Sequence, residues 1–351
     1  MFHPKTTLLS YIRLFFFSSC LLCFSAMTGV VDAKLVFRVG DDLYVSSDDG
    51  SRRRRITHNT QGVDEHPRWS PDGTQIAFTR FLDKKDMKTT QRSAELFIIN
   101  ADGTDPQRLT HNNFLDIDTA WSPDGRHIAF SSSRSGSWEV FVMELATRTV
   151  RQLTRAEEGA DTAGSTAPDW SPDGRHIIFE RFLRVKGGFS PKTIYIMSAD
   201  GHNQRPLVAH PAPNDPLTMN SFPRWSADGK RILFYEYEWF RDGGISKLIV
   251  KRIIGGKQEI TEINDRLGND FLIAGASWMA EDRSIVFSLK FFEKPNANYD
   301  LYRYDLQTRG LRRLTSTARD EKWPDWTAGA LSVSPHGKMT TLWGELKQSE
   351  H

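Results

Sequence analysis

The stretch Trp121-Ser-Pro-Asp-Gly125, followed by His127-Ile-Ala-Phe130, decides the fold of this 351-residue chain. It recurs with little change at intervals of 49 to 55 residues. The other copies are Trp69-Ser-Pro-Asp-Gly73, Trp170-Ser-Pro-Asp-Gly174, Trp225-Ser-Ala-Asp-Gly229 and the degenerate Trp278-Met-Ala-Glu-Asp282. A repeat of this length is too long for a helical hairpin and suits a four-stranded propeller blade.

Each repeat predicts four strands. Proline fixes φ at the first central position of a turn, and glycine supplies a positive φ after it, so Ser-Pro-Asp-Gly predicts a tight hairpin. The strand that follows alternates, as in Gln75-Ile-Ala-Phe78, and its Ile and Phe are core candidates. A third strand (Glu95–Ile99), a second Asp-Gly turn and a short fourth strand ending in Leu109-Thr110 complete the unit.

The two ends of the chain complete one blade between them. Residues 34–57 supply a second, third and fourth strand, and Trp323-Pro-Asp-Trp326 supplies the missing first strand. We therefore expect an all-β fold, a six-bladed β-propeller of four-stranded antiparallel blades, with the ring closed by pairing of the N-terminal strands with the C-terminal strand. An alternative register, with Val333 of Val333-Ser-Pro-His-Gly-Lys338 in the tryptophan position, also gives six blades. The expected segments are a signal peptide (1–33), the propeller (34–330) and a C-terminal tail (331–351).

The repeated Trp-Ser-Pro-Asp-Gly phrase resembles the PD40 repeat of TolB-like six-bladed propellers, over nearly all of residues 34–330. The resemblance implies a periplasmic or exported propeller, often a protein-binding module. In the type member, the propeller follows an N-terminal α/β domain and works in an envelope-spanning complex with a peptidoglycan-associated lipoprotein. Between Ala33 and the first strand this sequence leaves no room for such a domain, so a different role is expected.

The N-terminus has the pattern of a secretory signal. Lys5 and Arg13 precede an apolar run over residues 14–26, and small residues at Val31 and Ala33 favour cleavage after Ala33. The alternative is an uncleaved membrane anchor; after cleavage no membrane span is expected. Both cysteines lie within this signal, so the mature chain is expected to have neither a disulfide nor a catalytic thiol.

Composition and motifs argue against several functions. Cleavage after Ala33 lowers the formal net charge from +2 to +1, and such a balanced surface does not attract nucleic acid. Neither Gly-x-Ser-x-Gly nor His-Glu-x-x-His occurs in the sequence, so a serine hydrolase or a zinc protease of the usual kinds is not indicated. An enzyme site assembled from several blades would leave no linear motif.

The repeats differ most between their second and third strands and between successive blades, and both connections emerge on one face of a propeller. We call this the loop face. Its aromatic residues beside Lys and Arg suit contact with a peptide or a glycan. These candidates are Phe81, Phe182, Trp239, Phe240 and Phe292. The alternative is that the rings pack against their own loops.

A second set of candidates lies five residues before each tryptophan, where the first strands should surround the mouth of the channel. These residues are Asp64, Asp116, Ser165, Asn220, Ile273 and Glu321. Asp64, Asp116 and Glu321 could bind a hard cation such as Ca²⁺, the only cofactor that the sequence suggests; alternatively they cap turns or hold channel water. One residue before four of the tryptophans stand Arg68, Asp169, Arg224 and Asp325, whose charges alternate. This alternation predicts the pairs Asp169–Arg224 and Asp325–Arg68.

These features predict an exported, non-catalytic scaffold that binds a protein or peptide in the cell envelope. The alternative is an enzyme that cleaves a polysaccharide or a peptide, with its site at the channel mouth. The enzyme interpretation requires Asp64, Asp116 and Glu321 to converge with each other or with a histidine.

Overall fold

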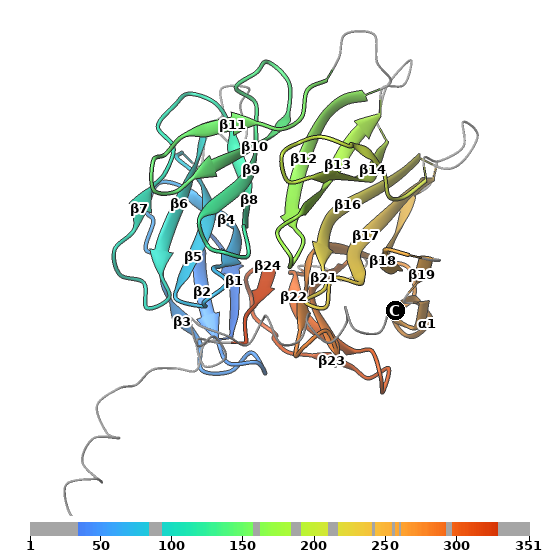
Figure 1. Ribbon diagram of the computed structural model, residues 1–351. Helices are drawn as coiled ribbons and strands as arrows, with labels where there is room; N and C mark the ends of the chain where they lie inside the picture. The colour runs from blue at the N-terminus through green and yellow to red at the C-terminus, as the bar shows by residue number, and fades with distance from the viewer. Residues whose placement is uncertain are drawn as a thin grey trace, which may run out of the picture. The chain divides into compact units, whose positions relative to one another are not determined.

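The computed structural model describes residues 34–83, 93–156, 162–183, 191–209, 217–240, 243–254, 257–259, 261–292 and 297–328. These residues form antiparallel sheets with one short helix, so the predicted all-β class is confirmed (Figure 1). The expected signal peptide and C-terminal tail lie outside the described residues.

Four sheets have four strands each. One has the order β24 (Glu321–Trp326), β1 (Leu35–Val39), β2 (Asp42–Ser46) and β3 (Arg54–Arg55). The next comprises β4 (Val63–Trp69), β5 (Gln75–Phe81), β6 (Ala94–Asn100) and β7 (Gln107–Arg108). A third comprises β8 (Asp116–Trp121), β9 (His127–Ser132), β10 (Glu139–Glu144) and β11 (Val150–Gln152). The fourth comprises β20 (Phe271–Met279), β21 (Ser284–Phe291), β22 (Asp300–Asp305) and β23 (Leu311–Arg313).

The remaining sheet has eight strands in two antiparallel sets. The first set comprises β12 (Thr162–Trp170), β13 (His176–Leu183), β14 (Lys192–Ser198) and β15 (Arg205–Pro206). The second comprises β16 (Leu217–Trp225), β17 (Arg231–Phe240), β18 (Gly243–Arg252) and β19 (Lys257–Glu259). The sets meet through one parallel bridge, between Lys192 and Met219.

The Ser-Pro-Asp-Gly phrase forms the hairpin turn that the sequence predicts. Between β4 and β5, the Gly73 amide donates to the Ser70 carbonyl (2.9 Å), and Gly73 has a φ of 69°. The Ser70 hydroxyl donates to Asp72 (2.6 Å) and accepts from the Gln75 amide (2.9 Å). Equivalent bonds occur at Ser122, Ser171 and Ser226, so each turn places its preceding tryptophan at the same end of its sheet.

The first strand of each four-strand set contacts the first strand of the next set. Successive contacts join β4, β8, β12, β16, β20 and β24, and β24 contacts β4 in turn. At the two ends of the described chain, β24 pairs antiparallel with β1, with Leu35 opposite Trp326 and Val39 opposite Glu321. All six first strands therefore have a first strand on either side.

The core lies between the sheets and consists mainly of side chains from the second and third strands. The phenylalanine at the end of each alternating segment has no exposed surface. Where the segment reads Ile-x-Phe, the isoleucine is also fully buried. These phenylalanines are Phe37, Phe78, Phe130, Phe179, Phe234 and Phe287. Each contributes roughly 2–3 kcal/mol through burial. The Ile and Phe positions predicted as core are confirmed.

One helix, α1 (Thr261–Leu267), follows β19 and was not predicted. Its Ile263 is buried in the core around β20 and β21, and its Glu262 accepts a hydrogen bond from the Tyr304 hydroxyl (3.2 Å). Among the described residues, no helix has the length and apolar character needed to cross a membrane.

Candidate functional site

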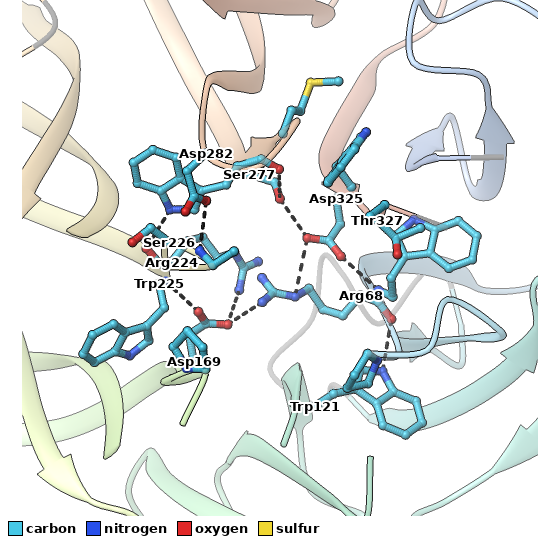
Figure 2. Close-up of a pocket in the computed structure, with 18 of the residues that line it drawn as sticks. Arg68, Trp121, Asp169, Arg224, Trp225, Ser226, Ser277, Asp282, Asp325 and Thr327 are labelled. Carbon is cyan, nitrogen blue, oxygen red and sulfur yellow. Dashed lines mark hydrogen bonds and ion pairs between the residues drawn. The ribbon is translucent and has the colours of Figure 1, made fainter. Parts of the chain in front are cut away.

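A pocket with a volume of about 370 Å³ lies at the ends of the first strands, beside the Ser-Pro-Asp-Gly turns (Figure 2). We call this end of the sheets the turn face. Tryptophans from all six first strands line the pocket. They are Trp69, Trp121, Trp170, Trp225, Trp278 and Trp326. Turn residues such as Pro71, Pro172 and Ala227 complete the wall.

The tryptophans hold neighbouring sheets together as well as lining the pocket. The Trp121 indole N–H donates to the Arg68 carbonyl of the preceding sheet (3.2 Å), and the Trp278 indole donates in the same way to the Arg224 carbonyl (3.1 Å). Trp69 and Trp278 are each 7% exposed. The predicted scaffold role therefore holds, and the same residues contribute to the wall of the pocket.

The base of the pocket is formed by four charged residues, each one position before a tryptophan (Figure 2). Arg224 lies 3.7 Å from Asp169, and Arg68 lies 3.8 Å from Asp325, so both predicted pairs are confirmed. Arg68 also donates to Asp169, which links the two pairs. The remaining carboxylate oxygens accept the backbone amides of Trp225 (2.8 Å) and Trp69 (2.9 Å). Burial raises the pKa of Asp169 to about 6, against the opposing effect of Arg68.

Behind these charges, side chains from different first strands contact one another. Three residues before each tryptophan, every first strand has a residue with positive φ. These residues are His66, Asp118, Ala167, Phe222, Gly275 and Trp323. All six lie within a register shift between the first strand and its partner, as expected for bulges that turn side chains out of the regular alternation.

Three of these side chains form an aromatic cluster that we call the plug. The ring of Trp323 lies 4.2 Å from His66 and 4.6 Å from Phe222, centroid to centroid. Gly275 faces the same ring: a Cβ there would lie 2.8 Å from Trp323 Cε3 and 3.0 Å from its Cα. The absence of a side chain at Gly275 therefore makes room for Trp323.

A buried acid, Asp118, lies next to the histidine of the plug. Nδ1 of His66 is 3.1 Å from Oδ1 of Asp118, and both residues are buried. Burial lowers the pKa of His66 to about 4. Burial, with a smaller contribution from Glu180, raises the pKa of Asp118 to about 7. Both residues are therefore mainly neutral in mildly acidic solution, as expected where water cannot solvate a charge.

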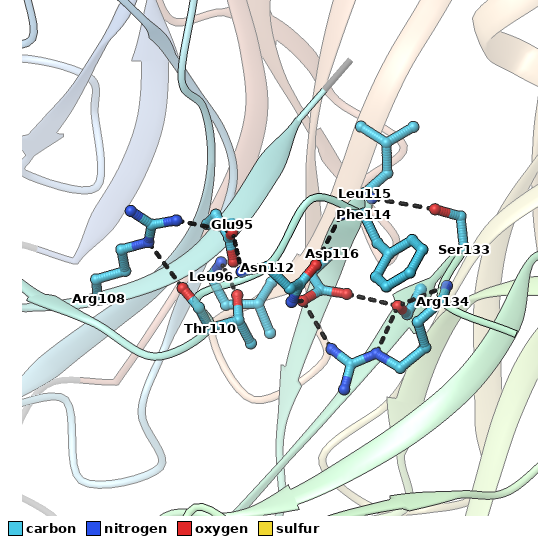
Figure 3. Close-up of polar contacts among 11 residues, drawn as sticks. Glu95, Leu96, Arg108, Thr110, Asn112, Phe114, Leu115, Asp116, Ser133 and Arg134 are labelled. Carbon is cyan, nitrogen blue, oxygen red and sulfur yellow. Dashed lines mark hydrogen bonds and ion pairs between the residues drawn. The ribbon is translucent and has the colours of Figure 1, made fainter. Parts of the chain in front are cut away.

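At the opposite mouth of the channel, the predicted metal-binding carboxylates are each engaged by an arginine. Figure 3 shows one of them, Asp116, with Arg134. Asp64 accepts two bonds from Arg80 (2.6 and 2.8 Å). Asp116 accepts from Arg134 (2.7 Å), and also from Asn112 and Ser132. Glu321 accepts from Arg53 (2.6 Å).

The three carboxylates do not form a metal centre in the described structure. Among the described residues, no three His, Cys, Asp or Glu side chains come close enough to hold an ion. Each carboxylate of the expected ring is instead neutralised by an arginine within its own sheet. The convergence required for the enzyme interpretation is likewise not seen: His66, the buried histidine of the channel, pairs with Asp118 and not with Asp64, Asp116 or Glu321.

The predicted aromatic residues of the loop face differ in exposure. Phe81 is buried with Val63 and Ala94. Phe182 is half-buried, with the Lys192 ammonium 4.7 Å from its ring. Trp239 is 40% exposed and packs edge-on against Tyr237, and Phe292 is 50% exposed. The side chain of Phe240, and much of the loops themselves, lie outside the described residues.

Comparison with known proteins agrees with this geometry. Residues 48–181 match the family model of PD40, the TolB β-propeller domain. The crystal structure of TolB from Acinetobacter baumannii superimposes with a TM-score of 0.63 at 20% identity, covering 84% of this chain and 66% of that one. The chain therefore resembles TolB-like β-propellers: the PD40 match covers residues 48–181, and the fold is similar to that of TolB.

Curated relatives of this TolB-like propeller match over shorter stretches. Over 122 residues the chain is 29% identical to the Tol-Pal system protein TolB of Desulfosudis oleivorans, covering 35% of this chain and 25% of that protein. Over 144 residues it is 29% identical to the protein TolB homolog of Chlorobium luteolum, covering 31% of this chain and 33% of that protein. The matches therefore span a quarter to a third of these two relatives.

Sequence reasoning located the tryptophans but not the pocket of the TolB-like propeller. It treated the repeated residues as scaffold and sought the binding surface on the loop face. The plug was also missed, because the six equivalent positions of the first strands, three of which form it, hold six different residue types. Counting three residues back from each tryptophan would have found them, since that count falls on His66, Phe222 and Trp323.

Proposed function

We propose that this TolB-like propeller is a non-catalytic module that binds a protein or peptide of the cell envelope through the tryptophan-lined pocket on its turn face. The observation that carries the proposal is the pocket itself, which six tryptophan residues line and behind which the plug lies. We further infer that the six four-strand sets form a closed ring. The pairing of β24 with β1 and the contacts between successive first strands support that inference.

The size and chemistry of the pocket suit a few side chains of a polypeptide. Its volume of about 370 Å³ falls in the lower part of the range typical of ligand sites. Indole edges offer large apolar contact area at a small entropic cost, and tryptophan is enriched among residues that dominate protein interfaces. The charged groups at its base are fixed by ion pairs and backbone amides, so they are organised before a ligand arrives.

The cell-envelope location rests on the N-terminal signal pattern and on relatives named as TolB proteins. We propose that the chain is exported and cleaved after Ala33, as a periplasmic or secreted protein. Sequencing the N-terminus of the protein purified from its native cells tests this: cleavage gives a chain that begins at Lys34. A chain that retains Lys5 and Arg13 in the membrane fraction would establish the anchored alternative.

The binding proposal is tested by filling the pocket without removing a contact. Ala328 is exposed and lines the rim, so Ala328→Trp adds an indole there. The matched variant Trp239→Ala/Phe292→Ala strips the loop face. In pull-downs from envelope extract, we expect Ala328→Trp to lower partner recovery at least about tenfold and the loop-face variant to retain it. Loss in the loop-face variant alone would place the partner on the surface predicted from sequence. Full recovery with both variants would exclude both faces.

A further inference from the structure

One side of the pocket rim departs from the repeat. In the degenerate copy, Ala280, Glu281 and Asp282 replace Pro-Asp-Gly, and all three have positive φ (50°, 55° and 63°). The Arg283 amide still donates to the Ala280 carbonyl (3.2 Å), so the turn closes with the opposite handedness. Left-handed backbone at three successive non-glycine residues costs roughly 1–2 kcal/mol each, and somewhat less for Asp. We call residues 280–283 the rim turn.

A carboxylate clamp holds the rim turn in place. Asp282 accepts the backbone amides of Ala227 (2.9 Å) and Asp228 (3.0 Å) from the neighbouring Ser-Ala-Asp-Gly turn. Ala227 occupies the position that is proline in the three intact copies, and proline has no amide to donate. The two departures from the repeat therefore fit each other, and together they build a distinct wall on this side of the pocket.

The consequence of this wall is a negative charge at the rim. Two cations line the pocket in the described structure, and both are paired at its base. Arg68 contacts Asp169 and Asp325, and Arg224 contacts Asp169. The other charged lining residues are Glu281 and Asp282, and both are acidic. Asp282 is committed to the clamp. The Glu281 carboxylate is 86% exposed, with only the exposed Arg283 nearby at 3.9 Å, a contact that a ligand can replace at small cost.

One of the pocket tryptophans already has a cation of the protein itself over its ring. The guanidinium of Arg231 already lies over the ring of Trp278, 4.8 Å from its centroid. Such contacts are worth about 0.5–1 kcal/mol at exposed sites. Half-buried indoles at Trp170, Trp225 and Trp326 extend the same kind of surface around the pocket.

We propose that the pocket receives a cationic group of its partner, a lysine or arginine side chain or an N-terminal ammonium, and that Glu281 on the rim turn is the residue that selects for it. This inference rests on the proposed binding function and specifies its ligand. It also explains why strain is retained on one side of the pocket: the rim turn projects a carboxylate where the intact turns have the tip of a Pro-Asp-Gly hairpin.

Selection from a random heptapeptide library displayed on phage tests the inference without a known partner. The mature protein is the target, and Ala328→Trp, with its pocket filled, is the subtraction control. We expect peptides that depend on the open pocket to be enriched in Lys and Arg. Glu281→Gln should weaken individual basic binders about fivefold, and Glu281→Lys should reverse the charge preference. Glu144→Lys, which reverses an exposed acid at the end of β10, outside the pocket lining, should change neither.

The outcomes separate the two proposals. Pocket-dependent peptides with no excess of Lys and Arg, or binding unaffected by Glu281→Lys, would overturn the cationic ligand and leave the binding pocket standing. Peptides that bind Ala328→Trp as well as the unmodified protein would overturn the pocket itself. A preference that also reverses in Glu144→Lys would attribute the selection to overall charge, against a role for Glu281.

Discussion

Replacing Gly275 with alanine tests whether the channel is packed as tightly as the plug implies. Gly275 has a φ of 85°, where an L-residue is strained, and an added Cβ would lie 2.8 Å from Trp323 Cε3 and 3.0 Å from Trp323 Cα. The second contact is with backbone of β24, which rotation of a side chain cannot relieve. We expect about 1 kcal/mol from the backbone conformation and about 1–3 kcal/mol from overpacking.

Gly125 provides the matched control. It has a φ of 68°, and an added Cβ would meet nothing within 4 Å. Gly125→Ala should therefore lose only the conformational part, about 1 kcal/mol. The free energy of unfolding is measured by urea titration with tryptophan fluorescence as the readout, and the prediction is that Gly275→Ala loses about 1–3 kcal/mol more than Gly125→Ala. Equal losses would show that Trp323 does not occupy the space in front of Gly275, and the blocked channel would have to be abandoned.

Two further predictions concern buried carboxylates. The raised pKa of Asp118 stabilises the folded protein fully below about pH 4, and this stabilisation is lost as the pH rises toward about 7. The lowered pKa of His66 acts in the opposite direction: its stabilisation is complete above about pH 6.5 and is lost as the pH falls toward about 4. The two effects offset each other between these limits. Asp118→Asn should therefore make the slope of the free energy of unfolding against pH more positive than that of the unmodified protein, by roughly 1.4 kcal/mol per pH unit between about pH 4.5 and about pH 6. Equal slopes for the two proteins in urea titrations at several pH values would contradict the assignment. Asp282→Ala removes the acceptor of the Ala227 and Asp228 amides and should lower the free energy of unfolding by about 2–3 kcal/mol; Glu281→Ala, next to it but exposed, is the control and should cost less than about 0.5 kcal/mol.

Local sequence predicts much of this fold because its turns are specified locally. Proline, aspartate and glycine of Pro71-Asp-Gly73 each suit one position of the hairpin, and the alternation of Ile76 and Phe78 follows from the pleat of a strand. The pairs Asp169–Arg224 and Asp325–Arg68 were also predicted, because counting from each tryptophan gives residues of equal depth on neighbouring first strands.

Features that depend on neighbours from distant parts of the sequence were not predicted. Asp64 was predicted as a metal ligand because the sequence alone did not show that Arg80 occupies its carboxylate. The register of β4 and β5 places Arg80 opposite Asp64. Arg68 contacts Asp169 as well as its predicted partner Asp325. The contact with Asp169 depends on the width of the channel. The plug depends on a bulge in each first strand, and the residues there share no side-chain type that a motif could reveal.

The central claim, that the partner binds the turn face, is tested most directly by site-specific photo-crosslinking in living cells. A photoreactive amino acid is placed at Ala328 on the pocket rim, and in a second strain at Phe292 on the loop face, where the native side chain is 50% exposed. The account predicts a partner crosslinked from position 328 and none from position 292. A partner crosslinked from position 292 and not from 328 would contradict it.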